Sequence, residues 1–244
     1  MIDRDIFFDS VRLSPFGGSL TQAQVDGMNY LLEVWEWGWE KPNPRDGNKW
    51  LAYCLATAYH ETGAKMTPVA ENGGKAYGNP PKSYWNPVGP YKKAYYGRGH
   101  VQLTWEDNYK KGQQRLKDVY GLDVLIHPHP ELMLDDRPSA LILFDGMSVG
   151  WFTGVGLPKY FNGTTEDPYN ARRVVNGTDQ AQKIAGYYQN FKVAIVTAPD
   201  APAIAEPETP PAEETLEPDH PVLTVSSHKP VRIRLGDNVS MADE

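Results

Sequence analysis

The sequence predicts a mainly α domain (α+β in class), with a small β-hairpin region lining a cleft and a disordered C-terminal tail. Apolar residues recur at helical spacing in several long segments, and residues 65–105 are instead rich in Gly, Pro, Asn and Tyr. From residue 198 the composition changes to Pro, Glu and Ala, which favours an extended, solvated chain. We therefore expect a folded domain over residues 1–197, a linker over 198–221 and a short tail over 222–244.

Four segments carry the spacing that is typical of helices. Thr21 and Gln24 match the capping box that opens a helix. The second helix is expected to end at Glu61, and Pro138 stands where a helix start favours proline. The apolar positions of the four helices are Val25, Met28, Leu32 and Trp35; Leu51, Cys54, Leu55 and Ala58; Leu141, Ile142, Phe144 and Met147; and Ala181, Ile184, Ala185, Tyr188 and Phe191. Residues 65–105 are expected to form loops and a small sheet, the floor of the cleft.

Two glutamates lie ten residues apart on different predicted elements. Glu61 falls at the edge of an apolar helical stripe, where we expect a partly desolvated carboxyl group. Glu71 precedes Asn72 and Gly73 in a loop, where we expect a solvated, charged carboxylate. Hydrolysis of a glycosidic bond requires such a difference, because one carboxyl donates a proton while the other activates water. By itself the pair leaves open the reading of two unrelated surface glutamates.

A second candidate segment follows at residues 95–105. Its glycines permit close approach of the backbone to a ligand or to another strand. Val101 and Leu103 alternate with Gln102 and Thr104, which predicts a strand with one packed face and one polar face. The polar face offers an amide and a hydroxyl that could hold a water molecule. An ordinary hairpin with polar positions is the alternative that this segment alone leaves open.

Three ordered motifs together resemble glycoside hydrolase family 19, which contains the plant-type chitinases and many bacteriophage endolysins. The resemblance runs from about residue 16 to residue 191. Its phage branch is the one that the segments Phe16–Gln22 and Gly150–Gly154 resemble. The three motifs are His60-Glu61-Thr62; Tyr96-Gly97-Arg98-Gly99 with Gln102-Leu103-Thr104-Trp105; and Arg172-Arg173-Val174-Val175-Asn176-Gly177.

The resemblance implies a lysozyme-like helical fold and a set of roles. Glu61 would be the general acid and Glu71 the general base, with carboxyl groups about 6.5–9.5 Å apart. Gln102 and Thr104 would position the attacking water. The residues expected to bind substrate are His60, Tyr96, Arg98, Trp105, Asn108, Asn176 and Trp85. Among these, Arg98 is expected to brace the acid site, while Trp85 is either a sugar platform or a loop anchor. Lys183 takes the place of an arginine that plant members carry near the acidic pair.

Charge and composition narrow the class of ligand. The formal net charge is −7, and residues 199–221 supply all of it through seven acidic side chains. The preceding domain is balanced, with 21 basic and 21 acidic side chains, which argues against nucleic-acid binding. Seven Trp and 14 Tyr offer stacking surfaces for a neutral polysaccharide. The single Cys54 excludes an internal disulfide, and we expect His127-Pro128-His129-Pro130 to be a turn, with no metal or other cofactor.

We therefore expect an endo-acting, inverting glycosidase that cleaves β-1,4 bonds between N-acetylhexosamines. Phage-like motifs and the absence of disulfides favour bacterial peptidoglycan as substrate, so that the chain would be an endolysin with lysozyme-like activity. Chitin is the alternative substrate, and an inactive carbohydrate-binding module is the alternative of another class. The acidic start of the chain does not resemble a signal peptide, and no segment is apolar enough for a membrane span. A monomer made in the bacterial cytoplasm and released to the wall through a holin fits these features.

Overall fold

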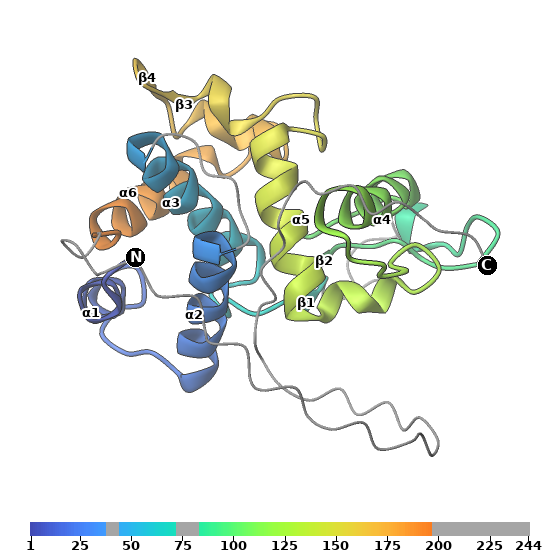
Figure 1. Ribbon diagram of the computed structural model, residues 1–244, viewed down its shortest axis with the longest axis horizontal. Coiled ribbons are helices and arrows are strands. Elements are labelled where there is room, and N and C mark those ends of the chain that lie inside the picture. Colours follow the sequence, from blue (N-terminus) through green and yellow to red (C-terminus); the bar gives the residue numbers. More distant parts are fainter. Residues whose placement is uncertain (38–43, 72–82, 197–244) are drawn as a thin grey trace, which may run out of the picture.

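The computed structural model describes residues 1–37, 44–71 and 83–196, and these residues form the mainly helical fold that the sequence predicts (Figure 1). The α-helices are α1 (Arg4–Leu13), α2 (Gln22–Trp37), α3 (Pro44–Glu61), α4 (Glu106–Tyr120), α5 (Asp136–Val149) and α6 (Ala181–Ala194). Short 3-10 helices are η1 (Ser83–Trp85), η2 (Pro130–Leu134), η3 (Leu157–Lys159) and η4 (Asn170–Val174). None of the described helices combines the length and apolar character needed to cross a membrane. The predicted linker and tail, 198–221 and 222–244, lie outside the described residues.

Helices α3 and α5 form the centre of the molecule. Every residue of α3 from 51 to 58 is buried, and α3 packs against both α6 and α5. In α5 the burial runs from Pro138 to Ser148. Figure 1 shows α5 between the group formed by α1, α2, α3 and α6 and the separate helix α4. The apolar stripes of several helices thus meet in one core.

The helix predictions are confirmed in most particulars. Thr21 N–H donates to Gln24 Oε1 (2.8 Å) and Gln24 N–H donates to Thr21 Oγ1 (3.3 Å), which is the predicted capping box. Helix α3 ends at Glu61 and α6 begins at Ala181, as expected. Helix α5 begins at Asp136, so Pro138 lies within its first turn, where its missing N–H costs no hydrogen bond. Helices α1 and α4 were not expected.

The predicted small sheet is present as two short antiparallel strands, β1 (Val69–Ala70) and β2 (Arg98–Gly99). Val69 lies opposite Gly99, and Glu71 N–H extends the pairing by donating to Gly97 O (2.7 Å). Gly99 has φ +83°, and a Cβ there would lie 2.7 Å from Ser139 Oγ. Glycine therefore allows this strand to lie directly on α5. A second two-stranded sheet joins β3 (Phe161–Asn162) to β4 (Thr165–Glu166).

Residues 101–104 form a turn and not the predicted strand, but their side chains alternate between buried and half-buried positions as predicted. Arg98 and Leu103 exchange two backbone hydrogen bonds (3.2 and 2.8 Å), so the chain reverses through a tight turn in which Gln102 has φ +54°. Val101 and Leu103 are nevertheless buried, while Gln102 and Thr104 are only half-buried. The turn thus presents the amide and the hydroxyl on one side, as the alternation indicated.

Candidate active site

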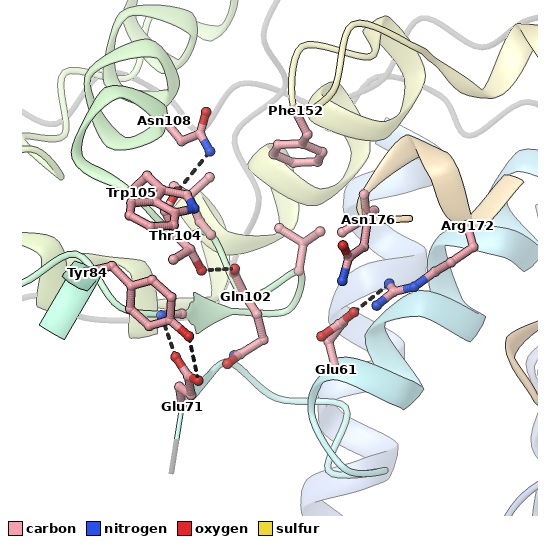
Figure 2. A pocket seen from close by; sticks show the side chains of 14 residues that line it. Glu61, Glu71, Tyr84, Gln102, Thr104, Trp105, Asn108, Phe152, Arg172 and Asn176 are labelled. Carbon is pink, nitrogen blue, oxygen red and sulfur yellow. Dashed lines mark hydrogen bonds and ion pairs between the residues drawn. The ribbon is translucent and has the colours of Figure 1, made fainter. Parts of the chain in front are cut away.

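A cavity of about 490 Å³ lies where the end of α3, the small sheet, the start of α4 and η4 meet (Figure 2). Its lining comprises Glu61, Glu71, Tyr84, Gly97, Val101, Gln102, Leu103, Thr104, Trp105, Asn108, Phe152, Arg172, Val175 and Asn176. Seven of the predicted site residues are among them, namely Glu61, Glu71, Gln102, Thr104, Trp105, Asn108 and Asn176. Four predicted residues do not line it: His60, Trp85, Tyr96 and Arg98.

Glu61, the last residue of α3, is partly removed from solvent and has a cationic partner. Arg172 Nη1 donates to Glu61 Oε1 over 2.6 Å, and the two side chains are 5% and 16% exposed. Arg172 is itself fixed by a bond from its Nε to Asp179 O (3.2 Å). The cation near the acidic pair was expected to be Lys183. The structure gives that place to Arg172 because η4 carries its guanidinium group onto the end of α3.

Glu71 lies directly after β1 and accepts two hydrogen bonds. Tyr84 Oη donates to Oε1 (3.1 Å) and Gly97 N–H donates to Oε2 (3.3 Å). Glu71 was expected to be a solvated, charged loop carboxylate; it lies in a loop position but is half-buried, because the strand pairing draws it onto the sheet. Figure 2 shows Glu71 and Glu61 entering the cavity from different elements. Two carboxylates in different surroundings thus face one space.

The predicted water-holding pair, Gln102 and Thr104, has its donors already engaged. Gln102 Nε2 donates to Val69 O (2.9 Å) and Gly99 O (3.0 Å), and Thr104 Oγ1 donates to Gln102 O (2.8 Å). A carboxamide has two N–H donors and a hydroxyl has one. All of these donors are used, so the two side chains have only acceptor positions left. They can therefore accept hydrogen bonds from a water molecule in the cavity and cannot donate to it.

One side of the cavity carries an exposed aromatic ring. Trp105 is 51% exposed, and its ring meets the Tyr84 ring edge-on at 5.0 Å. Asn108 lies one turn further along α4 and donates from Nδ2 to Thr104 O (2.8 Å). Figure 2 places Phe152 and Asn176 across the cavity from these groups. A flat apolar surface beside amide groups is the combination that a sugar ring requires.

Trp85, Tyr96 and Arg98 form a stack outside the cavity. The Trp85 and Tyr96 rings are stacked, with their centres 3.9 Å apart. The Arg98 guanidinium carbon lies 3.5 Å from the Tyr96 ring centre, so it must lie on the face of Tyr96 opposite Trp85. Arg98 Nη1 also donates to Tyr96 O (3.3 Å) and Tyr109 Oη (3.1 Å). The expectation that Arg98 braces the acid is therefore wrong, since it braces the loop before β2. Of the two readings of Trp85, the stack favours the loop anchor.

Two histidines near the motifs, His60 and His100, do not line the cavity. Burial lowers the pKa of His60, with Glu61 opposing the shift and Arg172 reinforcing it. His100 is fully buried, where its Nδ1 lies 2.8 Å from Ser139 Oγ and its Nε2 lies 3.3 Å from Met66 O. Burial lowers the pKa of His100 to about 4. His100 is thus a neutral polar link between the turn after β2, α5 and the loop before β1.

The His127–Pro130 segment forms a turn that runs into η2. His127 Nε2 lies 2.9 Å from Glu106 Oε1, so this histidine pairs with the first turn of α4. Across residues 1–37, 44–71 and 83–196, no three His, Cys, Asp or Glu side chains gather as metal ligands do.

Seven lining residues were not among the predicted site residues: Tyr84, Gly97, Val101, Leu103, Phe152, Arg172 and Val175. Arg172 and Val175 belong to the same motif as Asn176, so their closeness to Asn176 in the sequence could have predicted them. Phe152 belongs to the phage-like segment, and its ring packs on α5 at Gly146, where a Cβ would lie 2.0 Å from it. This contact depends on how the turn after α5 folds back onto the helix, which apolar spacing does not reveal.

No family model matches the chain. Endochitinase B of Zea mays is 30% identical over 149 residues, which cover 59% of this chain and 49% of that protein. The chain therefore matches about half the length of this relative. Similar solved structures include chitinase C from Streptomyces griseus, at 19% identity over 82% of this chain and 95% of that chain with a TM-score of 0.46. A family GH19, class IV chitinase from Zea mays is 16% identical over 80% and 94%, with a TM-score of 0.42.

Proposed function

We propose that this chain is a glycoside hydrolase of the family 19 type that cleaves β-1,4 bonds between N-acetylhexosamines with inversion. The observation that carries the proposal is the cavity shared by Glu61 and Glu71. One carboxyl is paired with a guanidinium group and the other is fixed by two neutral donors. A binding module requires no such pair of differently held carboxyl groups, so the same observation disfavours an inactive module.

The acid half of the reaction follows from how Glu61 is held. Arg172 occupies Oε1, and within the described residues Oε2 has no hydrogen-bond partner. Figure 2 shows Oε2 turned away from Arg172. A proton on Glu61 would therefore sit on Oε2 and pass to the glycosidic oxygen as the bond from that oxygen to the anomeric carbon breaks. Arg172 would keep the carboxyl group in this orientation.

The activation of water by the general base follows from the acceptor positions of Glu71 and Thr104. A water molecule has two protons to donate, and Glu71 and Thr104 Oγ1 both offer free acceptor positions. Held in this way, the water would attack the anomeric carbon from the face opposite the leaving oxygen while Glu71 takes one proton. Direct displacement by water gives inversion of configuration.

Chitin is the substrate that the sequence relative supports, because the name of the maize protein is endochitinase. Peptidoglycan is the second candidate, supported by the phage-like segment Gly150–Gly154, which contributes Phe152 to the cavity lining. Both polymers contain β-1,4-linked N-acetylhexosamines, so one cavity can accept either. In the second case the chain would act as an endolysin that reaches the wall through a holin.

The test is digestion of chitin oligosaccharides and of purified peptidoglycan, with products identified by mass spectrometry and reducing-end analysis. Internal cleavage of chitin alone supports a chitinase, and new reducing ends in peptidoglycan support the endolysin. Glu61→Gln serves as the inactive control in both assays. Binding to either polymer without cleavage would contradict the proposal and favour the inactive module.

A further inference from the structure

Tyr84 lies in η1 and points its hydroxyl group at Glu71. Its Oη donates to Oε1 over 3.1 Å, while Gly97 N–H holds Oε2 over 3.3 Å. Each carboxylate oxygen can accept two hydrogen bonds, so each keeps one position for a further donor. We propose that Tyr84 is the positioning residue of the general base Glu71. This inference rests on the proposed hydrolase function and assigns a role to a residue that no motif contains.

The backbone segment 95–97 holds both Tyr84 and Glu71 in place. Tyr95 N–H donates to Tyr84 O (3.0 Å), and Gly97 N–H donates to the Glu71 carboxylate. Between them, the ring of Tyr96 stacks on Trp85, the neighbour of Tyr84. Three consecutive residues thus fix both the donor and the acceptor of the Tyr84–Glu71 bond. A hydroxyl group held in this way meets the carboxylate without an ordering cost during the reaction.

The ring of Tyr84 also contacts the exposed side of the cavity. Trp105 meets it edge-on at 5.0 Å with an interplanar angle of 88°, and both residues line the cavity. The Tyr84 ring therefore has support on the side away from Glu71. Replacing the hydroxyl group alone would leave this support in place, which makes Tyr84→Phe a clean test of the hydrogen bond.

The hydroxyl group has two effects on Glu71. It stabilises the charged carboxylate, and it directs the remaining acceptor position of Oε1. Tyr84→Phe should therefore lower kcat about tenfold or more, the scale of a hydrogen bond to a charged group. KM should stay within about twofold, because sugar contacts are retained. The acid-side inflection of the kcat/KM profile should move to higher pH, since the carboxylate loses a donor.

The experiment compares the full-length wild type, Tyr84→Phe and the control Tyr59→Phe on an N-acetylglucosamine hexamer across a pH series. Tyr59 Oη donates to Pro15 O (3.0 Å) outside the cavity lining, so Tyr59→Phe also removes one tyrosine hydroxyl bond. The proposal expects the kcat loss and the pH shift in Tyr84→Phe alone. Thermal unfolding of all three proteins identifies any loss that comes from stability.

Two outcomes separate this inference from the proposed function. An active wild type whose kcat and pH profile are unchanged in Tyr84→Phe, or changed equally in Tyr59→Phe, overturns the positioning role and leaves the hydrolase intact. A wild type that cleaves neither the hexamer nor peptidoglycan overturns the proposed function, and the positioning role with it.

Discussion

Arg172 Nη1 donates to Glu61 Oε1 across 2.6 Å, although 111 positions separate the two residues in the chain. Both side chains are largely removed from solvent. The bond joins the end of α3 to η4, and η4 also leads to Asn176 on the cavity wall. One ion pair therefore sets the proposed acid in a fixed relation to the opposite side of the cavity.

Replacing Arg172 should impair activity more than folding. Arg172→Ala should lower kcat about 100-fold, because Glu61 loses the group that orients Oε1. It should also lower the unfolding free energy by roughly 1–3 kcal/mol, because it leaves a part-buried carboxylate unpaired. Arg172→Lys should recover part of the activity, since lysine keeps the charge without the planar fork. Kinetics and urea denaturation measure the two effects. The neighbouring exposed Arg173→Ala is the control, and equal losses in both variants would refute the orienting role.

Glu61→Gln should lose roughly two or more decades of kcat, the range of general acid catalysis, because an amide N–H is too weakly acidic to protonate the glycosidic oxygen. Its thermal stability should remain near that of the wild type, since the amide oxygen can still accept from Arg172. Initial rates and thermal unfolding on the same preparations give both values. Glu131→Gln, at a glutamate that is 56% exposed, should retain full activity as the matched control. An active Glu61→Gln protein would remove Glu61 from the mechanism.

The stereochemistry of the first product tests the role of Glu71. A water molecule activated by Glu71 should release the α-anomer from a β-linked substrate, which proton NMR detects before mutarotation. Glu71→Ala should lose most activity, and added azide should restore cleavage. Azide would bond to the anomeric carbon as the glycosidic bond breaks and Glu61 protonates the leaving oxygen. The azide product should have the α-configuration. A β-anomer as the first product would indicate a retaining mechanism and would overturn the role given to Glu71.

The helices with regular apolar spacing could be predicted from the sequence, and those without it could not. In α4 the buried stripe is Tyr109, Gly112, Leu116 and Tyr120. Gly112 belongs there because a Cβ would lie 3.0 Å from Ile142 Cδ1 on α5. A glycine and two tyrosines hide the stripe from a count of apolar residues. In α1, Ile6 N–H donates to Asp3 Oδ1 (3.0 Å), so an aspartate at the N-cap position was the signal that could have predicted this helix.

For the site, local motifs supplied the cavity residues, and tertiary packing supplied their partners. Glu61, Glu71, Gln102 and Thr104 belong to short segments whose neighbours determine their faces, so they were found. Arg172 reaches Glu61 only because η4 folds back onto α3. Tyr84 and Trp85 share one Pro-rich segment, yet one lines the cavity and the other stacks outside it. Composition cannot distinguish the two.

His100 should make the protein lose stability in acid between about pH 6.5 and pH 4. Burial lowers its pKa to about 4, so as the pH falls below 6.5 the unfolded chain binds a proton that the folded chain does not. The unfolding free energy should fall by about 3 kcal/mol over this range and receive no further change from His100 below it. Urea denaturation at a series of pH values measures the slope. His100→Gln should flatten it, whereas His129→Gln, at an exposed histidine, should not. Equal slopes in the wild type and His100→Gln would show that another group causes the acid sensitivity.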